Sequence, residues 1–186
     1  MPYGIMLYFD NRTERTINSI WQALAKHNLT SSMLDEGIRP HITLAIYEEL
    51  DSRPCENEMI KLLSNTPSPS IQFTHLGLFT NPEPVIFAAP LVTKVLLDFH
   101  NELHLKLADE GKRSWEFYEP GKWVPHCSLA LGYKVENQAE IFRLCQEMPL
   151  PMNAQVIQMG VVNFKPVKDL FKHDFQIFEQ GQSREF

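Results

Sequence analysis

Two short stretches of this sequence echo each other: PHITLAI at residues 40–46 and PHCSLAL at residues 125–131. Each has a histidine after a proline, a hydroxyl residue two positions later, and a run of small and aliphatic residues behind it. A weaker echo aligns residues 76–78 with residues 159–161. The offsets of about 85 and 83 residues fit one duplication. We therefore expect two similar lobes related by a pseudo-twofold axis.

Side-chain alternation predicts what each stretch presents, because residues two apart on a β-strand share a face. One face of each strand is aliphatic. The opposite face carries His41, Thr43, Ala45 and Tyr47 in the first copy, and His126, Ser128, Ala130 and Gly132 in the second. A duplicated structural strand would explain the aliphatic residues, but it explains the histidines poorly. The small residues beside each histidine leave room for a ligand.

The two histidines and two hydroxyls suggest chemistry at phosphorus. Histidine titrates near pH 6.5, so one of the pair can be neutral while the other is protonated. The neutral imidazole takes a proton from water, and the imidazolium gives one to the leaving oxygen. The hydroxyls of Thr43 and Ser128 can donate hydrogen bonds to the non-bridging oxygens. We interpret His41, Thr43, His126 and Ser128 as the catalytic set of a phosphodiesterase that needs no metal or other cofactor.

The rest of the chain predicts an α+β fold in which strand and helix signals alternate. We expect one bilobal domain over residues 1–186, with repeat halves at about 1–90 and 91–178 and a polar tail at 179–186. Each lobe should hold a mainly antiparallel sheet with helices outside it. Expected strands cover residues 3–9, 41–47, 71–79, 85–89, 126–133, 154–163 and 170–178, and expected helices include a long one that Thr93 caps and Gly111 ends, and a short one at about 136–147.

Composition and charge narrow the function classes. The 186 residues are 44% hydrophobic and 22% charged, as in an ordinary globular protein. Three cysteines without a Cys-x-x-Cys spacing argue against a disulfide framework and favour a cytoplasmic location. The N-terminus is typical of a strand rather than a signal peptide. A net charge of -6 disfavours duplex DNA and membranes as partners, but permits one small phosphate-bearing ligand. We expect a monomer.

The paired His-x-(Thr or Ser) motifs resemble those of the 2H phosphoesterase superfamily, which includes 2′-5′ RNA ligase-like proteins and RNA cyclic phosphodiesterases. The run YEPGKWVPH at residues 118–126 is also similar to the segment before the second motif in some bacterial members. The resemblance implies a bilobal fold with the active site in a groove between the lobes, and it assigns catalysis to the four residues named above. It implies metal-free hydrolysis of 2′,3′-cyclic phosphate ends of RNA or nucleotides. The alternatives are a 2′-5′ phosphodiesterase or RNA ligase, a phosphodiesterase for another small cyclic phosphate, and an RNA-end-binding module without turnover.

Five further residues are candidates for binding the substrate. They are Tyr47, Trp123, Tyr118, Arg39 and Lys122. The aromatic residues could stack on a base, and the cations could contact a phosphate. Packing of the loop or the strand end would equally explain the aromatic residues, and solvated surface charge would explain the cations.

Three other histidines have a structural interpretation. His100 and His104 are four residues apart on an expected helix. The zinc-protease pattern needs glutamate directly after the first histidine, but here Asn101 follows and the glutamate is Glu102, which points elsewhere. We expect both histidines on a solvated helix face without a metal. His75 corresponds to Gln158 in the repeat, which favours a polar structural role over that of a third catalytic histidine.

Overall fold

The computed structural model describes residues 2–80, 83–164 and 167–176. The expected polar tail, part of the turn at 81–84 and the last residues of the expected strand at 170–178 lie outside these ranges. Within them the chain is an α+β protein, as the sequence predicts. The strands are β1 (Tyr3–Phe9), β2 (His41–Leu50), β3 (Ser70–Phe79), β4 (Val85–Pro90), β5 (Gly111–Ser114), β6 (Cys127–Ala130), β7 (Met152–Asn163) and β8 (Lys168–Asp174).

All strand pairs are antiparallel, and they form one continuous path. Its order is β5-β2-β1-β7-β3-β4-β6, with β8 pairing β7 off the path. The long strand β7 joins two groups of strands, because residues 152–155 pair with β3 while residues 156–163 pair with β1. The two motif strands belong to different groups, β2 to the β1 group and β6 to the β3–β4 group.

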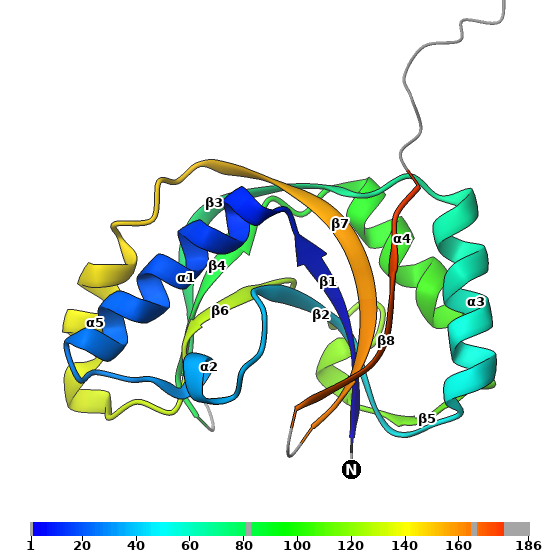
Figure 1. The fold of residues 1–186 in the computed structure, drawn as a ribbon, viewed down its shortest axis with the longest axis horizontal. Coiled ribbons are helices and arrows are strands. Elements are labelled where there is room, and N and C mark those ends of the chain that lie inside the picture. Colours follow the sequence, from blue (N-terminus) through cyan, green and yellow to red (C-terminus); the bar gives the residue numbers. More distant parts are fainter. Residues whose placement is uncertain (1, 81–82, 165–166, 177–186) are drawn as a thin grey trace, which may run out of the picture.

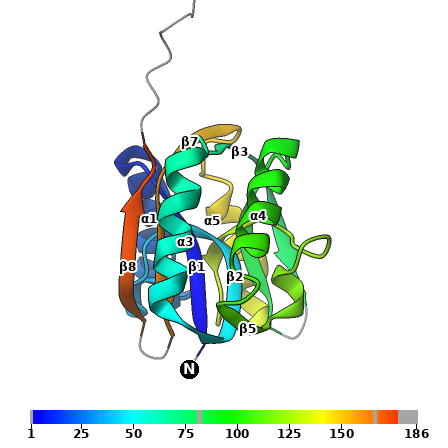
Figure 2. The same ribbon diagram turned by 90° about the vertical axis from the view of Figure 1, so that its right-hand side faces the viewer.

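Helices cover the two outer flanks of these strands. They are α1 (Asn11–Lys26), α2 (Ser32–Asp35), α3 (Ser52–Asn65), α4 (Lys94–Lys106) and α5 (Gln138–Cys145), with short 3-10 turns η1 (Glu116–Tyr118) and η2 (Val135–Asn137). In Figure 1, α1 and α5 lie on one flank and α3 and α4 on the other, with the strands between. Figure 2 shows α3 and α4 side by side over the strands. None of the helices in the described ranges is long and apolar enough to cross a membrane.

Local signals explain where the first helices of each half begin. The Asp10 carboxylate caps α1 by accepting from the amides of Arg12 and Thr13. Thr93 caps α4 by accepting from the amide of Leu96, as expected. However, α4 ends at Lys106, and Gly111 instead opens the short strand β5. Neither β5 nor α2 was expected from the sequence, because each has only four residues and no clear periodicity.

The order strand–helix–strand–helix–strand occurs twice, first as β1-α1-β2-α3-β3 and then as β4-α4-β6-α5-β7. This count leaves aside the short elements α2 and β5, and in it the second unit begins with the strand at Val85. The first helix of each unit also crosses to the strands of the other unit. The Trp21 indole on α1 donates to the carbonyl of Ser128 on β6, and His100 on α4 binds the carbonyl of Leu44 on β2. The sequence halves expected as lobes are thus interleaved in space, and each flank is built from both.

A bulge interrupts β2 in the middle of the first motif. His41, Ile42 and Thr43 pair with Tyr8, Leu7 and Met6, but Ala45 pairs with Ile5, so Leu44 has no partner on β1. One extra residue reverses which face the following side chains occupy. His41 and Thr43 face Tyr8 and Met6, whereas Ala45 and Tyr47 lie on the other face, with Ile5 and Tyr3. The strand expected over residues 41–47 is confirmed as part of β2, but the regular alternation expected along it is wrong for this reason.

Candidate functional site

The two motifs meet where β2 and β6 lie side by side (Figure 1). Burial raises the pKa of the Cys127 thiol to about 12, and the nearby backbone of His41 opposes this effect, so the starts of the two motifs are close together. The charge of a protonated His126 lowers the pKa of His41, so the two imidazoles are close enough to interact. Residues separated by 85 positions in the chain therefore lie close together in the structure.

Both imidazoles are oriented by the same local contact. His41 Nδ1 lies 2.7 Å from the carbonyl oxygen of Arg39, and His126 Nδ1 lies 2.8 Å from that of Val124. A carbonyl accepts but never donates, so Nδ1 carries the proton in both rings. In the neutral ring, Nε2 is then left with a lone pair for accepting a proton. A proline separates each histidine from its acceptor and restricts the backbone on both sides.

Burial lowers the pKa of both His41 and His126. It lowers the pKa of His41 to about 4, with the backbone contact to Arg39 opposing this effect and the charge of His126 adding to it. Burial also lowers the pKa of His126, opposed by its contact with Val124. Both rings are therefore neutral near pH 7 in the free protein. A bound phosphate anion would favour the protonated form of either ring.

The two hydroxyl residues share the site face with the histidines. Thr43 is 8% exposed, and its hydroxyl donates to the sulfur of Met6 at 3.2 Å. A thioether is a weak acceptor, so a phosphate oxygen would replace it readily. Ser128 pairs with Phe87 on the face that carries His126, and its side chain is partly exposed.

Tryptophan residues hold the backbone of both hydroxyl residues. Trp123 Nε1 donates to the carbonyl of Thr43 at 2.9 Å, and Trp21 Nε1 donates to that of Ser128 at 3.3 Å. Trp123 is 8% exposed, and its ring stacks on His100 at a centroid distance of 4.0 Å. The alternative in which Trp123 packs the loop is therefore the one its contacts favour, and it orients Thr43 through the backbone.

His100 and His104 lie against the bulge rather than on a solvated face. His100 is 1% exposed, and its Nε2 lies 2.9 Å from the carbonyl of Leu44 and 3.1 Å from that of Tyr118. His104 Nε2 lies 3.3 Å from the same Leu44 carbonyl. Burial lowers the pKa of His100 to about 4, so it is neutral. The expectation that His100 and His104 lie on a solvated helix face is wrong, because both rings bind the carbonyl of Leu44, the extra residue of the bulge.

Two of the candidate substrate-binding residues, Tyr47 and Lys122, are engaged in contacts with other protein groups. Tyr47 is buried on the far side of the sheet, with its hydroxyl 3.5 Å from His104 Nδ1, because the bulge turns it away from His41. Lys122 is exposed and forms ion pairs with Glu116 and Glu119. Tyr47 is thus misplaced for the role expected of it, and the Lys122 charge is already paired.

Tyr118 and Arg39 lie closer to the motif residues. Tyr118 is partly buried and contributes its carbonyl to His100. Arg39 binds Glu14 and the side-chain oxygen of Gln158, and its guanidinium lies 4.6 Å from the centre of the Tyr8 ring. Tyr8 in turn meets His41 edge-on at 6.5 Å. Arg39 is therefore next to the site, with its charge shared with Glu14.

An aromatic wall beside His126 was not expected from the sequence. Phe79 stacks on Phe87 at 4.3 Å, and their ring centres lie 5.0 and 5.3 Å from that of His126. A Cβ on Gly77 would come within 2.3 Å of the Phe87 ring, so glycine is required beneath it. Alternation along the two strands predicts that residues 77, 79, 85 and 87 share one face of the sheet. The sequence does not predict that this face lies next to His126, because that depends on which strands pair.

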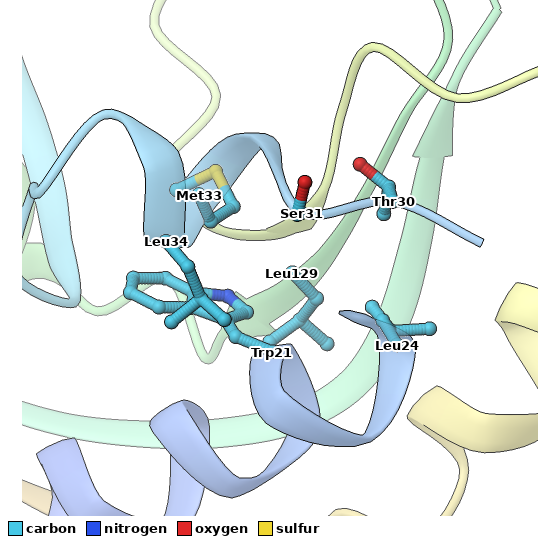
Figure 3. Close-up of a pocket in the computed structure, with 7 residues that line it drawn as sticks. All are labelled: Trp21, Leu24, Thr30, Ser31, Met33, Leu34 and Leu129. Carbon is cyan, nitrogen blue, oxygen red and sulfur yellow. The ribbon is translucent and has the colours of Figure 1, made fainter. Parts of the chain in front are cut away.

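A small crevice lies behind the motif strand β6, next to Trp21, whose indole binds the Ser128 carbonyl. It lies between α1, α2 and the reverse face of β6, and its lining is mainly apolar (Figure 3). Leu129, which lines it, is the residue of β6 without a partner on β4, because Ser128 pairs with Phe87 and Ala130 pairs with Ile86. Its interior has no room for a water molecule. The crevice therefore belongs to the core packing.

Metal-ligating side chains do not cluster at the motifs. Among the described residues, no group of three or more His, Cys, Asp or Glu side chains could hold a metal ion. His41, His126, His100 and His104 each already engage backbone carbonyls. The groups available at the site are therefore two imidazoles and two hydroxyls.

Comparison with known proteins identifies the family. The model of the 2′-5′ RNA ligase superfamily matches residues 10–166, so this chain belongs to that superfamily, and it is a 2H phosphoesterase. No curated protein matches the sequence.

Solved structures share the fold at low sequence identity. One, described as the crystal structure of a phosphoesterase, has a TM-score of 0.55 and 15% identity, covering 93% of this chain and 97% of its own. Usb1 of Kluyveromyces marxianus has a TM-score of 0.52 and 9% identity, covering 91% and 96%. Usb1 of the same organism with uridine monophosphate gives 0.51 and 8%, covering 91% and 97%.

Proposed function

We propose that this protein is a metal-independent phosphodiesterase that hydrolyses 2′,3′-cyclic phosphate ends of RNA or nucleotides. The observation that carries the proposal is the matched presentation of His41 and His126, each with Nδ1 bound to a backbone carbonyl. Membership of the 2′-5′ RNA ligase superfamily supports a phosphate ester as substrate. The similar fold seen with uridine monophosphate supports a nucleotide.

In the proposed reaction, one histidine acts as base and the other as acid. The neutral ring accepts a proton from water at Nε2 while the water oxygen attacks phosphorus. The bond from phosphorus to one ribose oxygen breaks, and the protonated ring donates its Nε2 proton to that oxygen. The hydroxyls of Thr43 and Ser128 donate to the non-bridging oxygens, where charge is stabilised in the transition state. Water supplies the oxygen that binds phosphorus and the proton that the base accepts, while the acid supplies the proton for the ribose oxygen. No further reactant is needed.

Hydrolysis or ligation at a 2′-5′ linkage is the second candidate. The same four groups would serve it, because in-line displacement at phosphorus needs a base and an acid on opposite sides. Membership of the 2′-5′ RNA ligase superfamily supports this candidate, because the reaction is again at a phosphate ester. The non-catalytic alternative, an RNA-end-binding module, is disfavoured because both histidines keep the orientation that proton transfer requires.

The test is an incubation in EDTA with a 2′,3′-cyclic mononucleotide, an oligonucleotide with a cyclic phosphate end, and a 2′-5′-linked dinucleotide. We expect ring opening by the wild type and none by the His41→Ala/His126→Ala double variant. Cleavage of the 2′-5′ dimer alone would establish the second candidate instead. Binding without turnover of any substrate would establish the binding module, and loss of activity in EDTA restored by one divalent ion would contradict the metal-free mechanism.

A further inference from the structure

The two histidines lie at the ends of two equivalent rows across the strands. In the first row, Tyr8 pairs with His41 on one side and with Gln158 on the other. In the second, Ala89 pairs with His75 on β3. The β4–β6 register pairs Ala88 with Cys127, and extending it by one residue places His126 beside Ala89. The rows are therefore Gln158–Tyr8–His41 and His75–Ala89–His126.

The first row is filled. Tyr8 is 2% exposed, and the Arg39 guanidinium lies over its ring. Gln158 uses its oxygen to accept from Arg39 and its nitrogen to donate to Asp174. Arg39 is further fixed by Glu14, whose side chain is 15% exposed. Both polar ends of Gln158 are thus engaged, and the space beside His41 is occupied by protein.

The second row has a small residue where the first has tyrosine. Ala89 carries one methyl group in the position equivalent to the Tyr8 ring. His75 is exposed, and its Nδ1 lies 3.0 Å from the hydroxyl of Thr74. Its Nε2 has no hydrogen-bond partner among the residues that the structure describes. The Phe79–Phe87 pair forms an apolar wall next to His126 on the same face.

Size and chemistry match a nucleoside. His75 and His126 stand two strands apart, about 10 Å at the backbone, which suits one nucleoside extending from a phosphate held by His126. A base is flat and apolar on its faces but polar at its edge, so it requires an apolar neighbour and a hydrogen-bonding group at the far end. The second row supplies both, whereas in the first row the Tyr8 ring is covered by Arg39 and both polar atoms of Gln158 are engaged.

We infer that the His75–Ala89–His126 row is the subsite for the base of the nucleotide that carries the reacting phosphate, and that His75 Nε2 binds the edge of that base. The inference rests on the proposed function for the identity of the phosphate. It makes His75 and Ala89 determinants of substrate specificity. It also means that the base binds on the His126 side of the phosphate and not on the His41 side, although both histidines contact the backbone in the same way.

The experiment compares nucleoside 2′,3′-cyclic phosphates with methyl riboside 2,3-cyclic phosphate, which has no base. Ala89→Tyr copies the filled row, and we expect it to lower kcat/KM for the nucleotides by roughly five- to a hundredfold, the range for losing one base contact. The base-free substrate should lose much less, because it has no base for the tyrosine ring to exclude. His75→Ala should raise KM for the nucleotides to a degree that depends on the base. His173→Ala, at a partly exposed strand histidine paired with Glu56, is the control.

Equal losses on both substrates, or nucleotide kinetics unchanged in both variants, would overturn the inference. The exposed position of His75 keeps this test available if Ala89→Tyr fails to fold, because truncating an exposed side chain rarely affects folding. A wild-type protein that opens no cyclic phosphate would instead contradict the proposed function. In that event, titration with a nucleoside 3′-monophosphate and with inorganic phosphate separates the two: weaker binding of the nucleotide alone by His75→Ala supports the base subsite, and unchanged binding rejects it.

Discussion

His41 and His126 bind the backbone in the same way, each through Nδ1 to the carbonyl of the residue two positions earlier. The matched contacts place the proton of each neutral ring on Nδ1 and direct Nε2 away from the backbone. The two motif strands come from different halves of the chain and lie side by side without pairing. In the proposed reaction, the two rings form an acid–base pair around one phosphate. The predictions below depend on this arrangement.

Replacing either histidine should disable the reaction. We expect His41→Ala and His126→Ala each to lower kcat on the order of 10²- to 10⁴-fold, the usual contribution of one acid or base. Steady-state assays on a cyclic mononucleotide measure the effect, with His173→Ala as the matched control. Near-normal turnover by either single variant would show that its ring transfers no proton.

Removing either hydroxyl should weaken transition-state stabilisation. Thr43→Ala and Ser128→Ala should each lose about 2 to 4 kcal/mol if each hydroxyl supplies one preorganised donor. Thr43→Ser retains the donor and should recover most of the activity, which separates hydrogen bonding from packing. A Thr43→Ala enzyme with unchanged kcat would mean that this hydroxyl contacts no reacting oxygen.

Trp123→Phe should lower activity without removing a group that touches substrate. The change leaves the buried Thr43 carbonyl without its indole donor, at a cost of about 1 to 3 kcal/mol in stability. We expect kcat to fall more than KM changes, because Thr43 is misplaced for the transition state. Trp115→Phe is the control, since its indole binds the exposed carboxylate of Glu48. Equal losses of kcat in both variants would contradict the positioning role.

The pH dependence of kcat/KM should have its optimum on the acid side of neutrality. The active free protein has one histidine neutral and the other protonated, a form most abundant between the two pKa values. Burial lowers the pKa of His41 to about 4 and the pKa of His126 below its usual 6.5. We expect activity to fall below about pH 4 and again as the pH rises past the His126 pKa.

The kcat profile should shift to higher pH, because a bound phosphate anion stabilises the imidazolium. Both profiles come from one series of initial-rate measurements across pH 3.5 to 8.5, with protein integrity checked by circular dichroism at each pH. A kcat/KM that still rises above pH 7.5 would rule out a pair with lowered pKa values.

Several features of this protein were determined by the sequence alone. The repeated Pro-His motifs predicted two strands, because proline, histidine and aliphatic residues act locally. The strands expected at 71–79 and 85–89 and the Thr93 cap followed from equally local signals. The family resemblance rested on the same few residues, and the match over residues 10–166 confirms it.

Tertiary structure decided the rest, since it depends on contacts between distant segments. Because of the bulge at Leu44, Tyr47 lies on the face opposite His41, and the buried His100 contacts the Leu44 carbonyl. No residue within 41–47 predicts the bulge. Which helix covers which strands was likewise set by long-range packing: α1 and α4 cross to the opposite units. The difference between Tyr8 and Ala89 acquires meaning only after strand pairing places one beside His41 and the other beside His126.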